Sequence, residues 1–408
     1  MQQRINKKRV IKGIHIKSII IALYVIAVLY TVFNLGSEYL GIPGLFYQGI
    51  FTSTVLVSFL YTIKWSLHKK TAIQILCILP LIGFNIYWSI DIKDSALYWF
   101  FWLLFLISLL KIVQQITPAQ FDILLKHVPY VLLCTSILLL VFSWPRINES
   151  LPTKNSLGIL SGASFIASTS IKKKNLGLLI AVLSLWVLNK SDSRSSMAFA
   201  LAIVSLQQLM NFHVKHLGVY IIGLVLVVAF RQNIFNFIED KMLKKEFFAT
   251  NLKEAIESAQ SERTMLLQEG WKIFKERPIT GYGLKTDYQK GRLSIVEGHF
   301  TGVHNGYLET LIEVGLFLSI FIGFIVLKVL YEILKHIREQ KNNTWYMFLL
   351  FGLIRAYGES YLYFNIGNMF SIIFIFLTIV LIKRPELFLS SNKTKSVIQG
   401  ARKIPIRA

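Results

Sequence analysis

A histidine opens the sequence HNGYLETLIEVG, residues 304–315, at the start of a long apolar segment. An imidazole is the side chain best suited to removing a proton near neutral pH, so His304 is a candidate general base. Asn305 or the residues before it are expected to cap the helix that follows, whose free backbone N–H groups favour a nearby anion. The alternative is that His304 is an ordinary interfacial residue with satisfied hydrogen bonds.

Two arginines are candidates for binding a phosphate group, because a guanidinium is a planar, permanently charged fork of donors. Arg194 lies in NKSDSRSSMAFALAIV, where an apolar segment begins, and Arg263 lies in SERTMLLQEGWKIFKERP. The second sequence predicts a helix from an N-cap at Ser261 to a stop at Pro278, with Arg263 at the head of its apolar face. Each arginine also has a simpler interpretation, as an anchor at a membrane surface or at the edge of a packed face.

The stretch ITGYGLKTDYQKG places Gly281 and Gly283 on either side of Tyr282. Glycines at this spacing indicate a turn. A single GxG pair is weak evidence for phosphate binding, so a structural turn is the preferred interpretation.

Ionisable residues also lie inside the apolar segments. RAYGESYLYF puts Arg355 and Glu359 four residues apart on one helix face, where they are expected to neutralise one another. Glu313 lies so deep that a charged carboxylate would need a partner. These three residues are interpreted as scaffold or as supports of a site, and the sequence leaves that choice open.

The elements that must position these residues are membrane spans. Hydrophobic residues make up 54% of the 408 residues and charged residues only 16%, which argues against a soluble multi-domain enzyme. The net charge of +22 comes mainly from short connections between apolar segments, without a nucleic-acid-binding motif, so no nucleic-acid partner is expected. Cys77 and Cys134 both lie in apolar segments and do not imply a disulfide.

Apolar segments of about 20 residues predict an all-α integral membrane protein with about 12 transmembrane helices and one large extracytoplasmic loop that contains helices. The expected spans are residues 18–34, 44–63, 72–90, 95–116, 128–144, 156–171, 175–189, 195–211, 216–231, 306–333, 345–363 and 366–382.

Lysine and arginine collect in alternate connections, which predicts that both termini are cytoplasmic. Residues 1–231 then hold helices 1–9, residues 306–383 hold helices 10–12, and residues 384–408 form a basic cytoplasmic tail. The large loop, residues 232–305, falls on the outer side. Long ordered loops on a rigid scaffold commonly carry binding and catalysis, so function is expected there.

The sequences SDSRSS, SERTMLLQEGWKIFKERPITGYG and HNGYLETLIEVGLF, in that order, resemble the O-antigen ligase and Wzy-type polysaccharide polymerase superfamily over residues 190–320. The resemblance implies a multi-pass glycosyltransferase of the GT-C class in the cytoplasmic (inner) membrane. Its substrate would be an undecaprenyl-diphosphate-linked glycan at the outer face, with no metal or other cofactor. The family's loop-flanking arginines match Arg194 and Arg263, and its catalytic histidine matches His304.

On this resemblance, the two arginines would hold the leaving diphosphate, and His304 would take the proton of the acceptor hydroxyl, giving inversion. Secondary candidates for contacts with the diphosphate or sugar are Lys285, Arg277, Arg292, Tyr282 and Asn305. Supporting structural roles are expected for Glu313, Arg355, Glu359, Gly281 and Gly283.

Polymerisation of lipid-linked repeat units into O-antigen, capsule or exopolysaccharide is the first interpretation, because repeat-unit polymerases are the commoner members and no acceptor-docking domain is evident. A ligase that transfers the finished glycan to lipid A-core, another surface lipid or a protein is the alternative. A lipid-linked glycan transporter or flippase without chemistry would instead spread ionisable residues through several spans. Expected partners are the glycan donor and acceptor and the bilayer, with polysaccharide export or chain-length-control proteins as further candidates.

Overall fold

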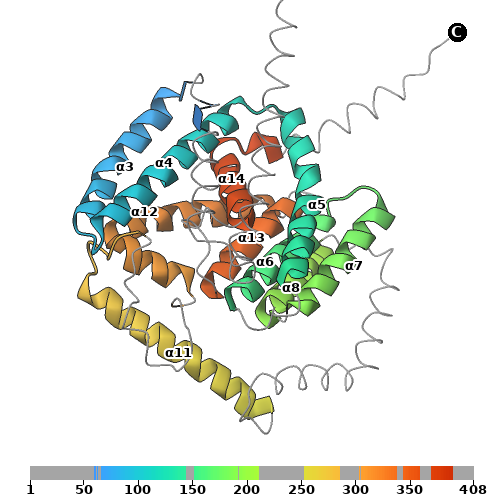
Figure 1. The fold of residues 1–408 in the computed structure, drawn as a ribbon. Helices are drawn as coiled ribbons and strands as arrows, with labels where there is room; N and C mark the ends of the chain where they lie inside the picture. Colours follow the sequence, from blue (N-terminus) through green and yellow to red (C-terminus); the bar gives the residue numbers. More distant parts are fainter. Residues whose placement is uncertain are drawn as a thin grey trace, which may run out of the picture.

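The structure is a computed structural model that describes residues 59–60, 62, 66–143, 151–191, 193–210, 252–284, 303, 305–337, 343–358 and 369–388. In this part of the chain every regular element is a helix (Figure 1). The helices are α3 (Lys69–Tyr87), α4 (Ile92–Gln115), α5 (Pro118–Ser143), α6 (Leu151–Ser168), α7 (Lys174–Lys190), α8 (Arg194–Met210), α11 (Leu252–Glu276), α12 (Gly306–Ile337), α13 (Thr344–Gly358) and α14 (Met369–Lys383).

Each of these helices except α11 overlaps a predicted span. By length and composition, α3, α4, α5 and α12 are able to cross a membrane, and α8 and α14 are shorter apolar helices. The predicted spans 18–34 and 216–231, and nearly all of 44–63, lie outside the described residues. The chain is thus helical and suited to a membrane in the part described, and the count of about 12 spans stays a prediction.

One span begins earlier than predicted for a local reason. α5 starts at Pro118, ahead of the expected residue 128. Thr117 N–H donates to Gln120 Oε1 at 2.9 Å, and Gln120 N–H donates to Thr117 Oγ1 at 3.3 Å. This reciprocal pair is a capping box, and proline suits the first helical position because it has no N–H to satisfy.

Small residues let α6 approach its neighbours closely. The helix contacts α5, α7, α8, α13 and α14, and much of its sequence is glycine, serine and alanine. A Cβ at Gly158 would overlap Ser193 before α8, and one at Gly162 would lie 3.0 Å from the Phe351 ring of α13. Close packing on the small residues of α6 therefore fixes the positions of α8 and α13, and both of these helices carry predicted site residues.

A buried amide joins three segments of the bundle. Gln207 of α8 donates from Nε2 to Thr344 Oγ1 of α13 at 2.9 Å and to Thr169 Oγ1, just after α6, at 3.1 Å. A buried polar group without partners would be costly, so these bonds specify how the three segments meet.

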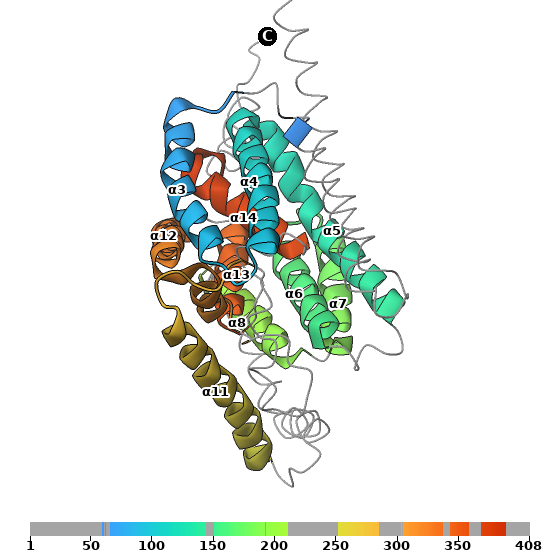
Figure 2. The same ribbon diagram turned by 60° about the vertical axis from the view of Figure 1, so that its left-hand side comes forward.

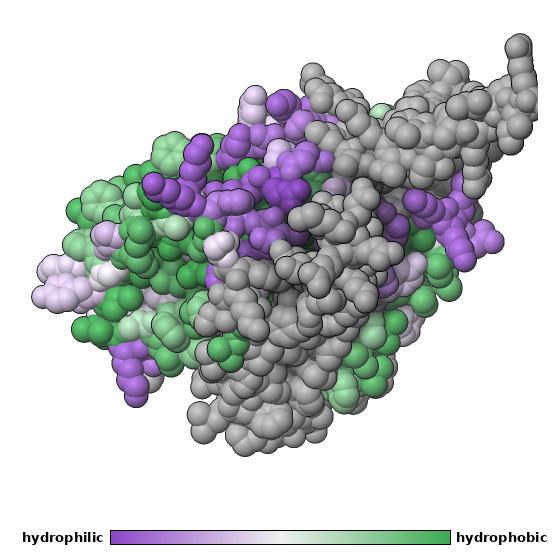
Figure 3. Space-filling model, turned by 90° about the horizontal axis from the view of Figure 1, so that it is seen from above, coloured by the Kyte–Doolittle hydropathy of each residue, from purple (hydrophilic) through white to green (hydrophobic). Residues whose placement is uncertain are grey.

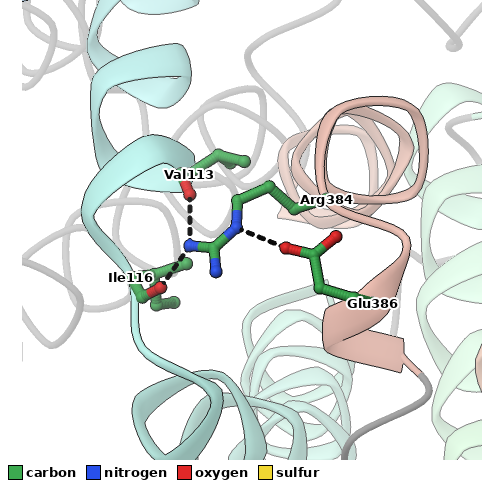
Figure 4. A network of polar contacts seen from close by, with 4 residues as sticks. All are labelled: Val113, Ile116, Arg384 and Glu386. Carbon is green, nitrogen blue, oxygen red and sulfur yellow. Dashed lines mark hydrogen bonds and ion pairs between the residues drawn. The ribbon is translucent and has the colours of Figure 1, made fainter.

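The chain after α14 turns back onto the end of α4 (Figure 4). Arg384 Nη1 donates to the carbonyl of Ile116 at 2.6 Å and to that of Val113 at 3.3 Å, while Nε donates to Glu386 at 2.9 Å. A cation is favourable at a helix C-terminus, where the last carbonyls lack helical partners. The first residues of the predicted tail therefore pack against the bundle.

The surface of the described helices is largely apolar. Figure 3 shows hydrophobic residues on the flanks of the molecule and a patch of hydrophilic residues between them. Exposed apolar side chains include Leu76 of α3 and Phe324 and Leu327 of α12. Such side chains are expected where a helix faces lipid or another span.

Helix α11 stands apart from the other helices in both ribbon views (Figures 1 and 2). Its C-terminal end meets the bundle beside α12, and its N-terminal end projects away from the bundle. Helix α11 is therefore attached to the bundle at one end, beside α12.

Candidate functional site

Helix α8 begins at Arg194, the first of the predicted phosphate-binding residues. Serines fix the turn before it: Ser193 Oγ donates to Ser196 Oγ at 2.9 Å, and Ser193 N–H donates to Ser191 Oγ at 3.3 Å. Gly158 of α6 packs directly against Ser193. The start of α8, which is the positive end of its dipole, is thus held in one place on α6.

Helix α12 begins at Gly306, two residues after the predicted catalytic histidine. Asn305 caps this helix, as the sequence predicts, because its Oδ1 accepts from Leu308 N–H at 3.0 Å and from Tyr307 N–H at 3.1 Å. Asn305 therefore has a structural role. Its neighbour His304 lies outside the described residues.

One turn of α13 contacts the starts of both α8 and α12. Arg355, which is 1% exposed, donates from Nη1 to Ser195 Oγ in the first turn of α8 at 2.7 Å. Tyr307 in the first turn of α12 donates its hydroxyl to the carbonyl of Leu353 at 2.8 Å. The two helix starts that adjoin predicted site residues therefore meet at the same turn of α13.

Helix α11 packs its apolar face on the start of α12. The buried cluster between them comprises Leu266, Ile273, Tyr282, Val303, Leu308 and Ile312. The backbones come closest at Gly270, where a Cβ would lie 2.7 Å from a Val303 methyl and 2.9 Å from a Leu308 methyl. Arg263 precedes Gly270 by two helical turns, so it lies on the same side of α11, about 10 Å further along its axis.

Helix α11, the helix of the predicted large loop, begins earlier than the sequence predicts. Helix α11 already begins at Leu252, so Ser261 lies inside it and the predicted N-cap was wrong. The added residues, LKEAIESAQ, are mostly strong helix formers, and they carry the helix through Ser261. The predicted end was correct, since α11 stops at Glu276, two residues before Pro278.

Helix α12 contains a break that the sequence analysis missed. Gly315 has φ 73° and ψ 178°, which interrupts the helix. The turn of residues 281–283 fills this break: Tyr282 N–H donates to the Ile312 carbonyl and Gly283 N–H to the Glu313 carbonyl, both at 2.9 Å. These two N–H groups are used by the break in α12 and are not available to a phosphate.

Two secondary candidates, Tyr282 and Arg277, take part in packing. Tyr282 is 2% exposed, and its hydroxyl donates to Glu276 Oε2 at 2.6 Å. Arg277 lies 5.2 Å from the centre of the Tyr282 ring and donates from Nη1 to the Trp88 carbonyl at 3.1 Å. These contacts fasten the end of α11 to the bundle, and the burial of Tyr282 does not support stacking of its ring on a sugar.

The remaining predicted residues fall into two groups. Glu313 is buried in α12 beside the break. Outside the described part lie His304, Lys285, Arg292 and Glu359, together with the side chains of Arg194 and Arg263. Within the described segments, no group of three or more His, Cys, Asp and Glu side chains could hold a metal ion. That the reaction needs no metal stays a prediction.

Comparison of the sequence with known protein families gives a match that includes α8, α11 and the start of α12. A sequence model of the O-antigen ligase family matches residues 179–323, which run from within α7 to within α12 and include all of α8 and α11. No curated protein and no solved structure matches the chain significantly. The family match and the apolar helices together indicate a glycosyltransferase-like membrane protein of surface-polysaccharide synthesis. Over residues 179–323 the chain is therefore similar to the O-antigen ligase family.

Proposed function

We propose that the protein polymerises undecaprenyl-diphosphate-linked oligosaccharide repeat units into a surface polysaccharide at the outer face of the cytoplasmic membrane. The growing glycan on one lipid is the donor, and a new lipid-linked repeat unit is the acceptor. The reaction is an inverting glycosyl transfer that needs no metal.

The chemistry is assigned to three residues. His304 removes the proton from the acceptor hydroxyl, whose oxygen forms a bond to the anomeric carbon on the face opposite the diphosphate. The bond from that carbon to the diphosphate oxygen breaks, and its electron pair leaves with the diphosphate. Arg194 and Arg263 hold this anion while its charge grows, which favours the transition state over the bound substrate.

One observation carries the proposal: α8 and α12 start at the same turn of α13, and α11 packs on the start of α12. Arg194, His304 and Arg263 stand on or beside these three elements, one on each. They are far apart in sequence, and the packing of the elements that carry them supports their assignment to one site.

The electrostatics of this region suit a diphosphate. Two helix N-termini meet there, and each presents the positive end of its dipole and backbone N–H groups. Arg355 donates to Ser195 in the first turn of α8 and so holds that helix start against α13. The apolar segment of α12 also begins at this point, so a lipid could keep its tail in the bilayer while its head group reaches the arginines.

The test uses purified protein in liposomes with a synthetic undecaprenyl-diphosphate repeat unit and a chelator. A ladder of lengthening lipid-linked chains on a gel is the expected result. Transfer that appears only when lipid A-core or another acceptor is added would make the protein a ligase. No transfer to any acceptor, with movement of the lipid-linked glycan across the bilayer, would replace the proposal with a transporter.

A further inference from the structure

Helices α3 and α4 cover the break in α12 together with the turn of residues 281–283. The Glu313 carbonyl accepts from Gly283 N–H and also from Asn85 Nδ2 of α3, at 3.0 Å. On the other side of the break, Leu316 N–H donates to the Pro278 carbonyl at 2.8 Å. Because an unpaired backbone group is costly inside a membrane, the break requires these partners.

Asn85 uses both ends of its side-chain amide. The residue is 1% exposed, and Nδ2 donates to the Thr280 carbonyl at 2.8 Å as well as to Glu313. Its Oδ1 accepts from Trp99 Nε1 of α4 at 2.9 Å. One side chain therefore connects α3, α4, the turn after α11 and the break in α12, which meet at one place in both ribbon views (Figures 1 and 2).

The connection between α3 and α4 and the first turn of α4 hold the same turn. Ile90 N–H donates to the Tyr282 carbonyl at 2.9 Å, and Leu284 N–H donates to Ser95 Oγ at 3.2 Å. Helices α3 and α4 precede the family segment, residues 179–323. This part of the chain thus holds elements of the family domain from outside it.

We propose that Asn85 is a positioning residue for the transfer reaction, a role that rests on the proposed function. The junction at Asn85 joins the end of α11 to α12, and Glu313 lies nine residues after His304. A shift at the junction is transmitted along α11 to Arg263 and along α12 to His304. Asn85 acts through these two elements and not by touching the substrate.

Three variants separate positioning from stability. Asn85→Leu removes the amide at similar volume. Trp99→Phe keeps a ring but removes the hydrogen bond that orients the amide. The matched control is Gln207→Leu, because Gln207 is also a buried amide that bridges helices, through Thr169 and Thr344, without contacting the junction.

The first readout is kinetic, with kcat and KM measured for the lipid-linked repeat unit. The second is a spin-label distance between the loop helix and the bundle, which does not depend on activity. Labels are placed at Lys272→Cys on α11 and Lys126→Cys on α5, whose side chains are well exposed. The free cysteines Cys77 and Cys134 are first changed to serine.

We expect Asn85→Leu to broaden or move the distance distribution and to lower kcat by about 10- to 100-fold, with KM within about threefold of wild type. Trp99→Phe should act in the same direction to a smaller extent, and it carries the test if Asn85→Leu does not fold. Gln207→Leu should lower the melting temperature and leave the distance between α11 and α5 unchanged.

An unchanged distance in Asn85→Leu would overturn the inference. So would a changed distance with wild-type kcat. If the wild-type protein transfers no glycan, the proposed function fails, and the distance measurement alone decides whether Asn85 holds the loop helix in place.

Discussion

Gly281 and Gly315 face each other, backbone to backbone, where the turn after α11 enters the break in α12. A Cβ at Gly281 would lie 2.5 Å from the Gly315 nitrogen, and a Cβ at Gly315 would overlap the Ile279 carbonyl. Both glycines have positive φ, 68° and 73°. Each is therefore required for two reasons, because neither the conformation nor the space accommodates a side chain.

Gly315→Ala should destabilise the protein. The backbone conformation at φ 73° and ψ 178° is essentially restricted to glycine and costs an alanine about 1–3 kcal/mol, and the overlap with Ile279 adds to that cost. The control is Gly323→Ala in the same helix, where a Cβ would meet nothing within 4 Å. Alanine is the better helix former, so this control should keep or raise stability. Equal melting temperatures in detergent for the two variants would contradict the role of the break.

Gly270→Val should push α11 away from the start of α12, because a Cβ at Gly270 already meets Val303 and Leu308. Misplacing a reacting group by about 1 Å costs up to about 100-fold in rate, so we expect glycan extension to fall by at least about tenfold. Gln268→Val, on the exposed side of the same helix, should leave extension unchanged. A wild-type ladder from Gly270→Val would show that this contact is not needed.

Tyr307→Phe tests the contact between α12 and α13. The change removes the hydroxyl that donates to the Leu353 carbonyl and keeps the ring, so it should cost about 1 kcal/mol of stability. Extension should fall several-fold, because the start of α12 loses its link to the turn that also contacts α8. Tyr331→Phe, which alters an exposed tyrosine of the same helix, should change neither the melting temperature nor the product ladder.

Features that depend on local sequence could be predicted. Helix α7 spans Lys174–Lys190 against a predicted 175–189, because the length of an apolar segment is a local property. The cap at Asn305 was likewise predicted from its position before the apolar segment. The capping box of α5 was also visible, as TPAQ at residues 117–120, but it was missed.

Features that depend on distant partners could not be predicted. A glycine at position 315 is compatible with a continuous helix, and the break requires Asn85 and the GYG turn to satisfy its carbonyls. The contact between Arg355 and Ser195 joins residues 160 positions apart. The arrangement of the candidate site therefore follows from packing between helices, which the hydropathy of single segments does not encode.

Arg194→Lys should impair transfer although the positive charge is kept. A lysine is a point charge and cannot donate two parallel hydrogen bonds to a phosphate as a guanidinium does. The serines before α8 should still hold the helix start, so the melting temperature should stay near that of wild type. The control is Arg277→Lys, which should transfer glycan as the wild type does, because a lysine can also donate to the Trp88 carbonyl. Wild-type turnover from Arg194→Lys would leave Arg194 as a membrane anchor.

His304→Ala should abolish glycan extension, since a positioned base contributes about 10²- to 10⁴-fold to proton transfer. The variant should still insert and accumulate, because the Asn305 cap and the bond from Tyr307 to Leu353 do not involve the imidazole. His127→Ala, at an exposed histidine of α5, is the control and should extend chains normally. If His304→Ala extended chains at the wild-type rate, the acceptor proton would have to leave by another route, and only the binding role of the two arginines would stand.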